Sequence, residues 1–122
     1  MSLYKDLSHQ IINCCFEVHN SIGPGFLEKV YQEALCVELN ESFLNFDKEV
    51  EFPVMYKQQH LGFNYKADIV VENKIIVELK ALSSLQDVHT SQCINYLKVS
   101  GLKVCLLINF GGKSVEIKRL VG

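Results

Sequence analysis

The 122-residue sequence lacks the features that mark several large classes of protein. It has no excess of basic residues: 12 lysine and arginine side chains stand against 14 aspartate and glutamate side chains, so the net charge is −2. A protein that holds nucleic acid by electrostatics alone carries a strongly basic surface. Any contact with nucleic acid must therefore be local, be assisted by a metal ion, or be built across an oligomer.

The sequence also has no CxxC pair and no apolar run long enough to span a bilayer. Its first residues show no basic segment followed by an uninterrupted apolar stretch, so we expect neither secretion nor membrane insertion. We expect a cytoplasmic protein whose cysteines are reduced and serve as small buried hydrophobic side chains. The cysteines are Cys14, Cys15, Cys36, Cys93 and Cys105.

The length and the hydrophobic content of 48% suit one domain with a real core and are too small for two. We therefore expect residues 1–122 to form a single domain. Apolar periodicity, glycine and proline positions predict an order of helix, helix, three strands, helix and two strands. The predicted helices cover about 4–20, 26–39 and 85–99, and the predicted strands cover 46–56, 63–71, 75–81, 104–110 and 114–120.

Turns between these segments set the expected topology. Residues 58–62 are predicted to turn the chain, and the tight connection at 72–74 predicts that strands 63–71 and 75–81 form an antiparallel hairpin. In the second helix, the inward stripe is expected to consist of Leu27, Val30, Tyr31, Ala34 and Leu35. The order fits an α/β or α+β core in which a mixed central sheet is flanked by helices.

Two carboxylates and one amine stand inside the otherwise apolar strands: Asp68, Glu78 and Lys80. An ionised side chain on a largely buried strand is costly unless it is paired, solvated through a cleft, or bound to metal. Because side chains alternate along a strand, Glu78 and Lys80 share a face, and the hairpin can bring Asp68 near Glu78. A solvated strand face with an ion pair between Lys80 and either carboxylate is the alternative explanation.

A metal-dependent phosphodiesterase site is the explanation that we favour. Hydrolysis of a phosphodiester needs a nucleophilic water, neutralisation of transition-state charge and stabilisation of the leaving oxygen, and a Mg²⁺ ion held by carboxylates can supply all three. Asp68 and Glu78 are hard oxygen ligands, and with the backbone carbonyl of Leu79 they suffice for Mg²⁺, or for Mn²⁺ as a substitute. Lys80 can orient or activate water and offset negative charge.

The segment Gly25–Tyr31 (GFLEKVY) matches the signature GxxExxY, and nearly the whole chain resembles the GxxExxY family of small bacterial and archaeal proteins. That family is similar to the PD-(D/E)XK nuclease superfamily and its RecB-like branch. The resemblance implies a restriction-endonuclease-like core and metal-dependent cleavage of DNA or RNA. It assigns the superfamily's aspartate to Asp68 and its ExK element to Glu78 and Lys80, with Ala67 where the motif has proline.

The same resemblance adds residues from two helices. It gives Glu28 the role of the further acidic ligand that RecB-like nucleases bring from a helix before the hairpin. It also matches Gln92 and Tyr96 to the QxxxY motif, which contributes to the active site and to nucleic-acid contacts. Taken alone, Glu28 also suits a helix N-terminus, and Gln92 and Tyr96 also suit an ordinary half-buried helix face. Tyr31 is expected to pack its ring in the core with its hydroxyl tethered.

Two expectations about function remain open at this stage. The first is a magnesium-dependent nuclease, and the second is a binding or assembly module that keeps the fold and site without catalysis. The acidic balance and the missing basic surface favour the second. Since a domain this small covers little nucleic acid, we also predict a homo-oligomer, formed through the exposed sheet edge or the first helix.

Overall fold

The structure is a computed structural model that describes residues 3–122. Helices and strands follow the predicted order, with most boundaries within two residues of those expected from the sequence. The elements are α1 (Lys5–Ile22), α2 (Glu28–Glu41), β1 (Phe46–Tyr56), β2 (Gln59–Val71), β3 (Ile75–Lys80), α3 (Asp87–Ser100), β4 (Val104–Asn109) and β5 (Glu116–Val121). Among the described residues, no helix is both long and apolar enough to cross a membrane.

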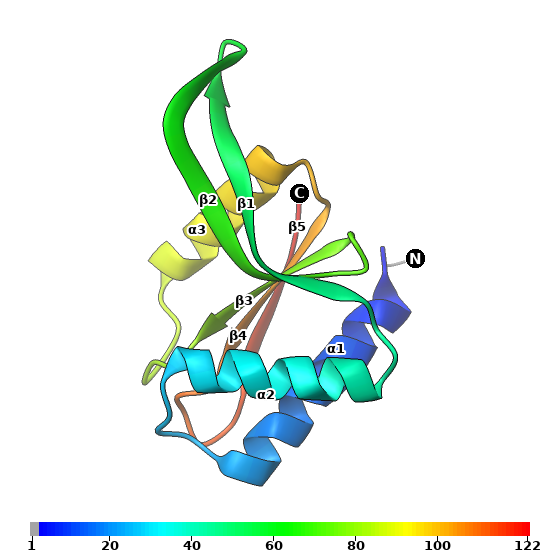
Figure 1. Cartoon of the computed structure of the whole chain (residues 1–122). Helices are drawn as coiled ribbons and strands as arrows, with labels where there is room; N and C mark the ends of the chain where they lie inside the picture. The colour runs from blue at the N-terminus through cyan, green and yellow to red at the C-terminus, as the bar shows by residue number, and fades with distance from the viewer. Residues whose placement is uncertain (1–2) are drawn as a thin grey trace.

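The five strands form one mixed sheet in the order β1-β2-β3-β4-β5. Strands β3 and β4 are parallel, and each other neighbouring pair is antiparallel. A parallel pair needs a long crossover, which α3 provides. Helices α1 and α2 cover one face of the sheet and α3 covers the other (Figure 1). This arrangement confirms the predicted α+β fold with a mixed sheet flanked by helices and is consistent with a restriction-endonuclease-like core.

The alternation of side chains along β3 divides the core into two layers. Val77 and Leu79 pack with α1 and α2, whereas Ile76 packs with Cys93 and Leu97 of α3. Glu78 shares the α3-side parity of Ile76. All five cysteines are buried and free, as predicted.

The connection between β1 and β2 differs from the sequence prediction. The turn is the two-residue segment Lys57–Gln58, and β2 begins at Gln59, so residues 59–62 are strand and not turn. Lys57 and Gln58 have φ values of 48° and 64°, the left-handed pair that matches the twist of a two-residue hairpin. Gly62, which suggested the turn, has a φ of 83° inside β2 and lies where the β1–β2 register shifts.

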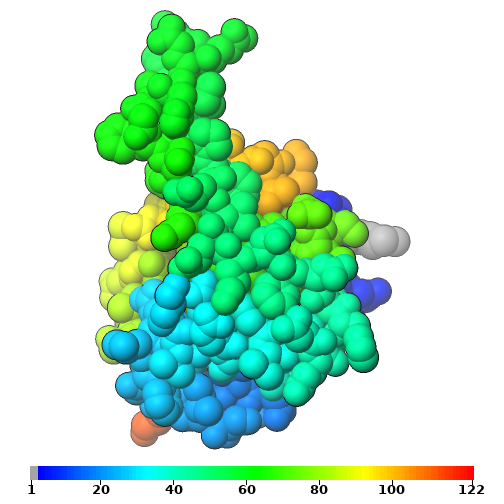
Figure 2. All heavy atoms as spheres, in the orientation of Figure 1, coloured from blue at the N-terminus to red at the C-terminus, as the bar shows by residue number. Residues whose placement is uncertain are grey.

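This longer hairpin forms a projecting arm, defined here as residues 52–66. Figures 1 and 2 show that the arm extends well beyond the body formed by the helices and the rest of the sheet. The inner ends of the same two strands carry Glu49 and Asp68, so the arm begins directly beside the charged residues singled out in the sequence.

The prediction that Leu27 and Val30 face inward was wrong. Helix α2 begins two residues later than expected, and Leu27 precedes it as a 77% exposed residue, while Val30 is 39% exposed. The inward anchor of this segment is Tyr31, which is fully buried, stacks on Phe110 at 4.6 Å, and donates a 2.6 Å hydrogen bond to the carbonyl of Gly23. The expected packing of Tyr31 is confirmed.

Candidate active site

The charged residues lie where β2 separates from β3. The backbone register between these strands runs from Val71↔Ile75 to Ile69↔Val77 and stops there. At the next position, the N–H of Asp68 donates to Glu78 Oε1 at 3.2 Å, and the N–H of Leu79 donates to Asp68 Oδ2 at 2.8 Å. Carboxylate oxygens thus accept the hydrogen bonds of these amides. The hairpin does bring Asp68 and Glu78 together, as the sequence predicted.

Glu78 is buried, with 4% of its surface exposed. Burial, and then the charge of Asp68, raise the pKa of Glu78 to about 9, although the hydrogen bond from the Asp68 amide opposes the shift. Two carboxyl groups that share a site cannot both ionise without cost. In the protein without a cation, Glu78 is therefore neutral near pH 7, and a bound cation would favour its ionised form.

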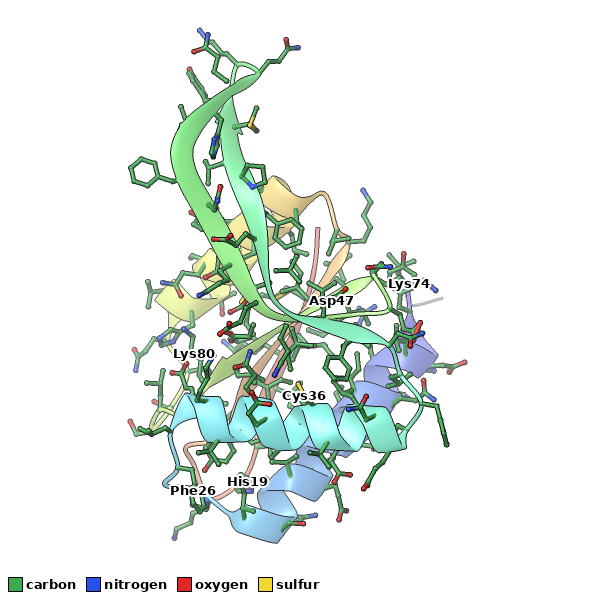
Figure 3. All side chains as sticks on the ribbon, in the orientation of Figure 1. His19, Phe26, Cys36, Asp47, Lys74 and Lys80 are labelled. Atoms are coloured by element: carbon green, nitrogen blue, oxygen red, sulfur yellow. The ribbon has the colours of Figure 1, made fainter. Side chains whose placement is uncertain are left out.

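Lys80 is half-buried at the last position of β3, where Figure 3 labels it. Its carbonyl accepts a 2.9 Å hydrogen bond from the N–H of Phe110. The contact of Cys93 with Cys105 lowers the pKa of the Cys93 thiol, and the positive charge of Lys80 lowers it further. The ammonium of Lys80 therefore lies within electrostatic reach of α3.

Asn109 fixes the chain that follows Lys80, a role not identified from the sequence. It is fully buried and pairs with Lys80 in the parallel β3–β4 register. Its side chain accepts from the N–H of Leu82 at 2.8 Å and donates to the carbonyl of Leu82 at 3.0 Å. Because a buried amide with its hydrogen bonds satisfied is rigid, the exit from β3 is held in place.

A cavity of about 210 Å³ joins the charged strands to α2. Glu28, the first residue of α2, and Asp68 both line this cavity, so the structure brings the predicted helical acid to the same opening. The lining residues are Glu28, Lys29, Gln32, Glu49, Asp68 and Leu79.

Three residues of this cavity were not predicted from the sequence, namely Lys29, Gln32 and Glu49, and Gln32 is the buried one. It is 4% exposed, and its Nε2 donates to the carbonyl of Asp68 at 2.9 Å. Gln32 follows Glu28 by four residues, so both lie on one face of α2. This spacing could have identified Gln32 as a residue of the cavity. Lys29 and Glu49 form an ion pair at the same cavity.

The paired carboxyl groups of Asp68 and Glu78 fit a hard divalent cation, but the predicted set of three carboxylates is not assembled, because Glu78 does not line the cavity that Asp68 shares with Glu28. Asp68 and Glu78 supply oxygen ligands of the kind that Mg²⁺ prefers, and Leu79 lines the same cavity as Asp68. Within residues 3–122, no group of three or more histidine, cysteine, aspartate or glutamate side chains is arranged to hold a metal ion. Glu28 therefore shares the cavity without joining a preformed cluster.

Helix α3 brings Tyr96 to this region. Tyr96 is half-buried and packs edge-on against Tyr65 of β2, with ring centroids 4.9 Å apart. Burial, and then the charge of Glu78, raise the pKa of Tyr96 to about 12, so its phenol stays protonated and can donate a hydrogen bond. Gln92 is exposed. His89 accepts a 2.9 Å hydrogen bond from the N–H of Gln86 and thereby caps α3.

One comparison with known proteins gave a match. A protein-family model described as the PD-(D/E)XK nuclease superfamily matches residues 5–120. Comparisons with curated proteins and with solved structures found no match. The matched range contains all three helices and every residue placed in the candidate site.

Proposed function

The chain belongs to the PD-(D/E)XK nuclease superfamily, and from this we propose that it is a divalent-metal-dependent nuclease that hydrolyses phosphodiester bonds of DNA or RNA. The observation that carries the proposal is the paired arrangement of Asp68 and Glu78 at the point where β2 leaves β3. A carboxylate pair at an open strand end offers oxygen ligands beside a cavity that a phosphate can approach.

Asp68 and Glu78 would hold the cation, Mg²⁺ or Mn²⁺, together with the backbone carbonyl of Leu79. Such a cation, when bound, activates water and neutralises charge on the phosphate. Glu28 would complete the acidic set from the α2 side of the cavity. Because Glu78 is neutral without a cation, it must lose its proton to serve as a ligand, so metal binding releases a proton near neutral pH.

The remaining residues would act on the substrate. Lys80, on the same strand face as Glu78, would orient the attacking water and offset negative charge on the scissile phosphate. Tyr96, whose phenol is protonated, would donate a hydrogen bond to a phosphate oxygen. The exposed amide of Gln92, one turn earlier on α3, would contact the adjacent backbone.

The direct test is cleavage of a mixed set of labelled substrates. Single- and double-stranded DNA and RNA are incubated with the purified protein and Mg²⁺ or Mn²⁺, beside Glu78→Ala, Lys80→Ala and an EDTA control. We expect cleavage by the wild type that needs the metal and is lost in both variants. If the wild type cleaves no substrate above the variants, the protein is a non-catalytic module that retains the nuclease fold.

Self-association is also proposed, and of the two sheet edges, β1 and β5, the β1 edge is a less favourable surface than helix α1. Edge strand β1 contains Pro53, which has no N–H, and Glu49, whose φ of 52° interrupts regular extension. Such features block strand pairing between copies. Helix α1 exposes 44% of Phe16 and is the better surface. Light scattering that finds only a monomer at micromolar concentration would exclude a stable oligomer.

A further inference from the structure

The arm formed by residues 52–66 has one face rich in aromatic side chains. In its register, Phe52 lies opposite Tyr65 and Tyr56 lies opposite Gln59. Tyr65 and Gln59 have the same parity on β2, so the alternation of side chains is in phase on both sides of the register shift, and the face that carries Phe52 and Tyr65 also carries the apolar residues farther out on both strands. This aromatic face consists of Phe52, Val54, Tyr56, Leu61, Phe63 and Tyr65.

The aromatic face begins at the candidate active site and becomes more exposed along the arm. At its base, Phe52 packs against the α3-side core, and Tyr65 packs against Tyr96. Farther out, Tyr56 is 62% exposed and Phe63 is 71% exposed. Figure 2 shows that the outer part of the arm stands clear of the body. Exposed apolar surface of this kind marks an interaction site.

The charges of the arm favour an anionic partner. Its lysines are Lys57 and Lys66, and no aspartate or glutamate lies between positions 52 and 66 of a chain whose net charge is −2. The Lys57 ammonium lies 5.5 Å from the centre of the Tyr56 ring. Cations beside exposed aromatic rings suit a strand that offers phosphates and unpaired bases, because each base has a face that can stack.

We propose that the aromatic face of the arm binds the unpaired bases of single-stranded nucleic acid and leads that strand to Asp68 and Glu78. The inference rests on the proposed nuclease function and narrows its substrate. Bases in a duplex are already stacked on their neighbours, so a protruding ring gains contact only with a base that is unpaired. A second copy of this chain is the competing occupant of the same surface.

The test measures binding separately from cleavage. Fluorescence anisotropy follows a labelled single strand and a duplex of equal length, as DNA and as RNA, in EDTA so that no cleavage occurs. We expect the wild type to prefer the single strand, and Phe63→Ala and Tyr56→Ala each to weaken that binding about tenfold, from the strength of one base stack. Met55→Ala is the matched control, since Met55 is 52% exposed and lies on the opposite face.

Several outcomes would overturn the inference. They are no binding by the wild type, a preference for the duplex, or equal affinities for the Phe63→Ala and Met55→Ala proteins. Sedimentation is run on the same samples. If Phe63→Ala converts a dimer into a monomer without changing the oligonucleotide affinity, the arm holds a second copy. If the wild type cleaves nucleic acid and the arm variants bind the single strand as tightly as the wild type, only this inference is refuted. If the arm variants bind less tightly but the wild type cleaves no substrate, only the proposed nuclease activity is refuted.

Discussion

The two halves of strand β3 differ in their strand pairing and in their side chains. From Ile75 to Val77 the strand pairs with both neighbours, β2 and β4, and every side chain is fully buried and apolar. From Glu78 to Lys80 it pairs in register with β4 alone, and the vacated side carries the carboxyl of Asp68. The first half of β3 therefore belongs to the core, whereas the second half carries charged residues of the candidate site, because β2 no longer pairs with it.

The comparison shows how a buried sheet can carry charge. In a regularly paired strand, the backbone N–H groups already donate to carbonyls of the neighbouring strand. Where β2 separates from β3, the N–H groups of Asp68 and Leu79 donate to carboxyl oxygens instead. Continued pairing with β4 holds Glu78 and Lys80 in fixed positions, which a site on a loop would lack.

The largest effect expected from the difference between the two halves of β3 is a dependence of stability on pH, caused by Glu78. The folded pKa of Glu78, about 9, lies above the ordinary glutamate value of 4.5, so the folded protein binds this proton more tightly than the unfolded chain. This proton therefore adds to the free energy of unfolding, by an amount on the order of several kcal/mol. The added stability is complete below about pH 4.5 and is lost as the pH rises through about 9.

Thermal unfolding in EDTA from about pH 5 to about pH 9 measures this effect. The wild type should lose stability with rising pH, and Glu78→Gln, which cannot titrate, should lose much less. Glu51→Gln replaces an exposed glutamate on β1 and should leave the wild-type slope unchanged. Parallel slopes for wild type and Glu78→Gln would show that Glu78 is not buried as described.

The second prediction compares the two lysines at the ends of the strand. Figure 3 labels Lys80, at the end of β3, and Lys74, in the turn before it. Lys80→Ala should slow metal-dependent cleavage about 10²–10³-fold, the usual cost of removing one group that stabilises transition-state charge. Lys74→Ala should cleave at the wild-type rate. Equal rates for the two variants, measured with saturating substrate, would remove Lys80 from the chemistry.

A smaller effect is expected at Gln32. Gln32→Leu removes the 2.9 Å hydrogen bond to the Asp68 carbonyl and should lower metal affinity or cleavage about tenfold, as outer partners of metal ligands do. Glu33→Gln alters the adjacent exposed residue, which pairs with Lys48 outside the cavity, and serves as the control. A Gln32→Leu protein with a lower melting temperature but unchanged metal affinity and cleavage would make Gln32 purely structural.

The smallest effect concerns the apolar half. Ile75→Val deletes one buried methylene and should cost about 0.5–1.5 kcal/mol of unfolding free energy. Cleavage well below the melting temperature should not change, because Ile75 lies at the opposite end of β3 from Lys80 and pairs with Val71. Urea unfolding measures the first quantity and an initial-rate assay the second. A substantial loss of cleavage in Ile75→Val would mean that the two halves of β3 are coupled.

Much of the fold follows from local patterns in the sequence. The hairpin at 72–74 and the apolar strands of the core were predictable because period-two alternation and turn residues act over a few positions. The proximity of Asp68 and Glu78 followed from that hairpin. The position of the β1–β2 turn could not be predicted in the same way. Gly62 suggested a turn but lies at an irregularity inside β2, whereas the turn itself consists of Lys57 and Gln58 and contains no glycine.

The details of the site required the three-dimensional structure. The opening of β2 away from β3, the hydrogen bond from Gln32 and the anchoring of Leu82 by Asn109 each join segments separated by 10 to 36 residues. Burial of Glu78 likewise depends on α3 packing over β3, which no window of sequence specifies. Local periodicity identified the charged residues but could not show which of their hydrogen bonds replace backbone pairing.

Metal binding tests the central claim most directly, namely that Asp68 and Glu78 form a cation site. Mn²⁺ is titrated into the protein, and the signal of free Mn²⁺ is followed by electron paramagnetic resonance. We predict a saturable site in the wild type that is lost in Asp68→Ala and retained in Asp47→Ala, which removes an exposed aspartate of β1 that lies opposite Val70 and outside the candidate cavity. Equal binding by the wild type and Asp68→Ala, or no binding by either, would contradict the account.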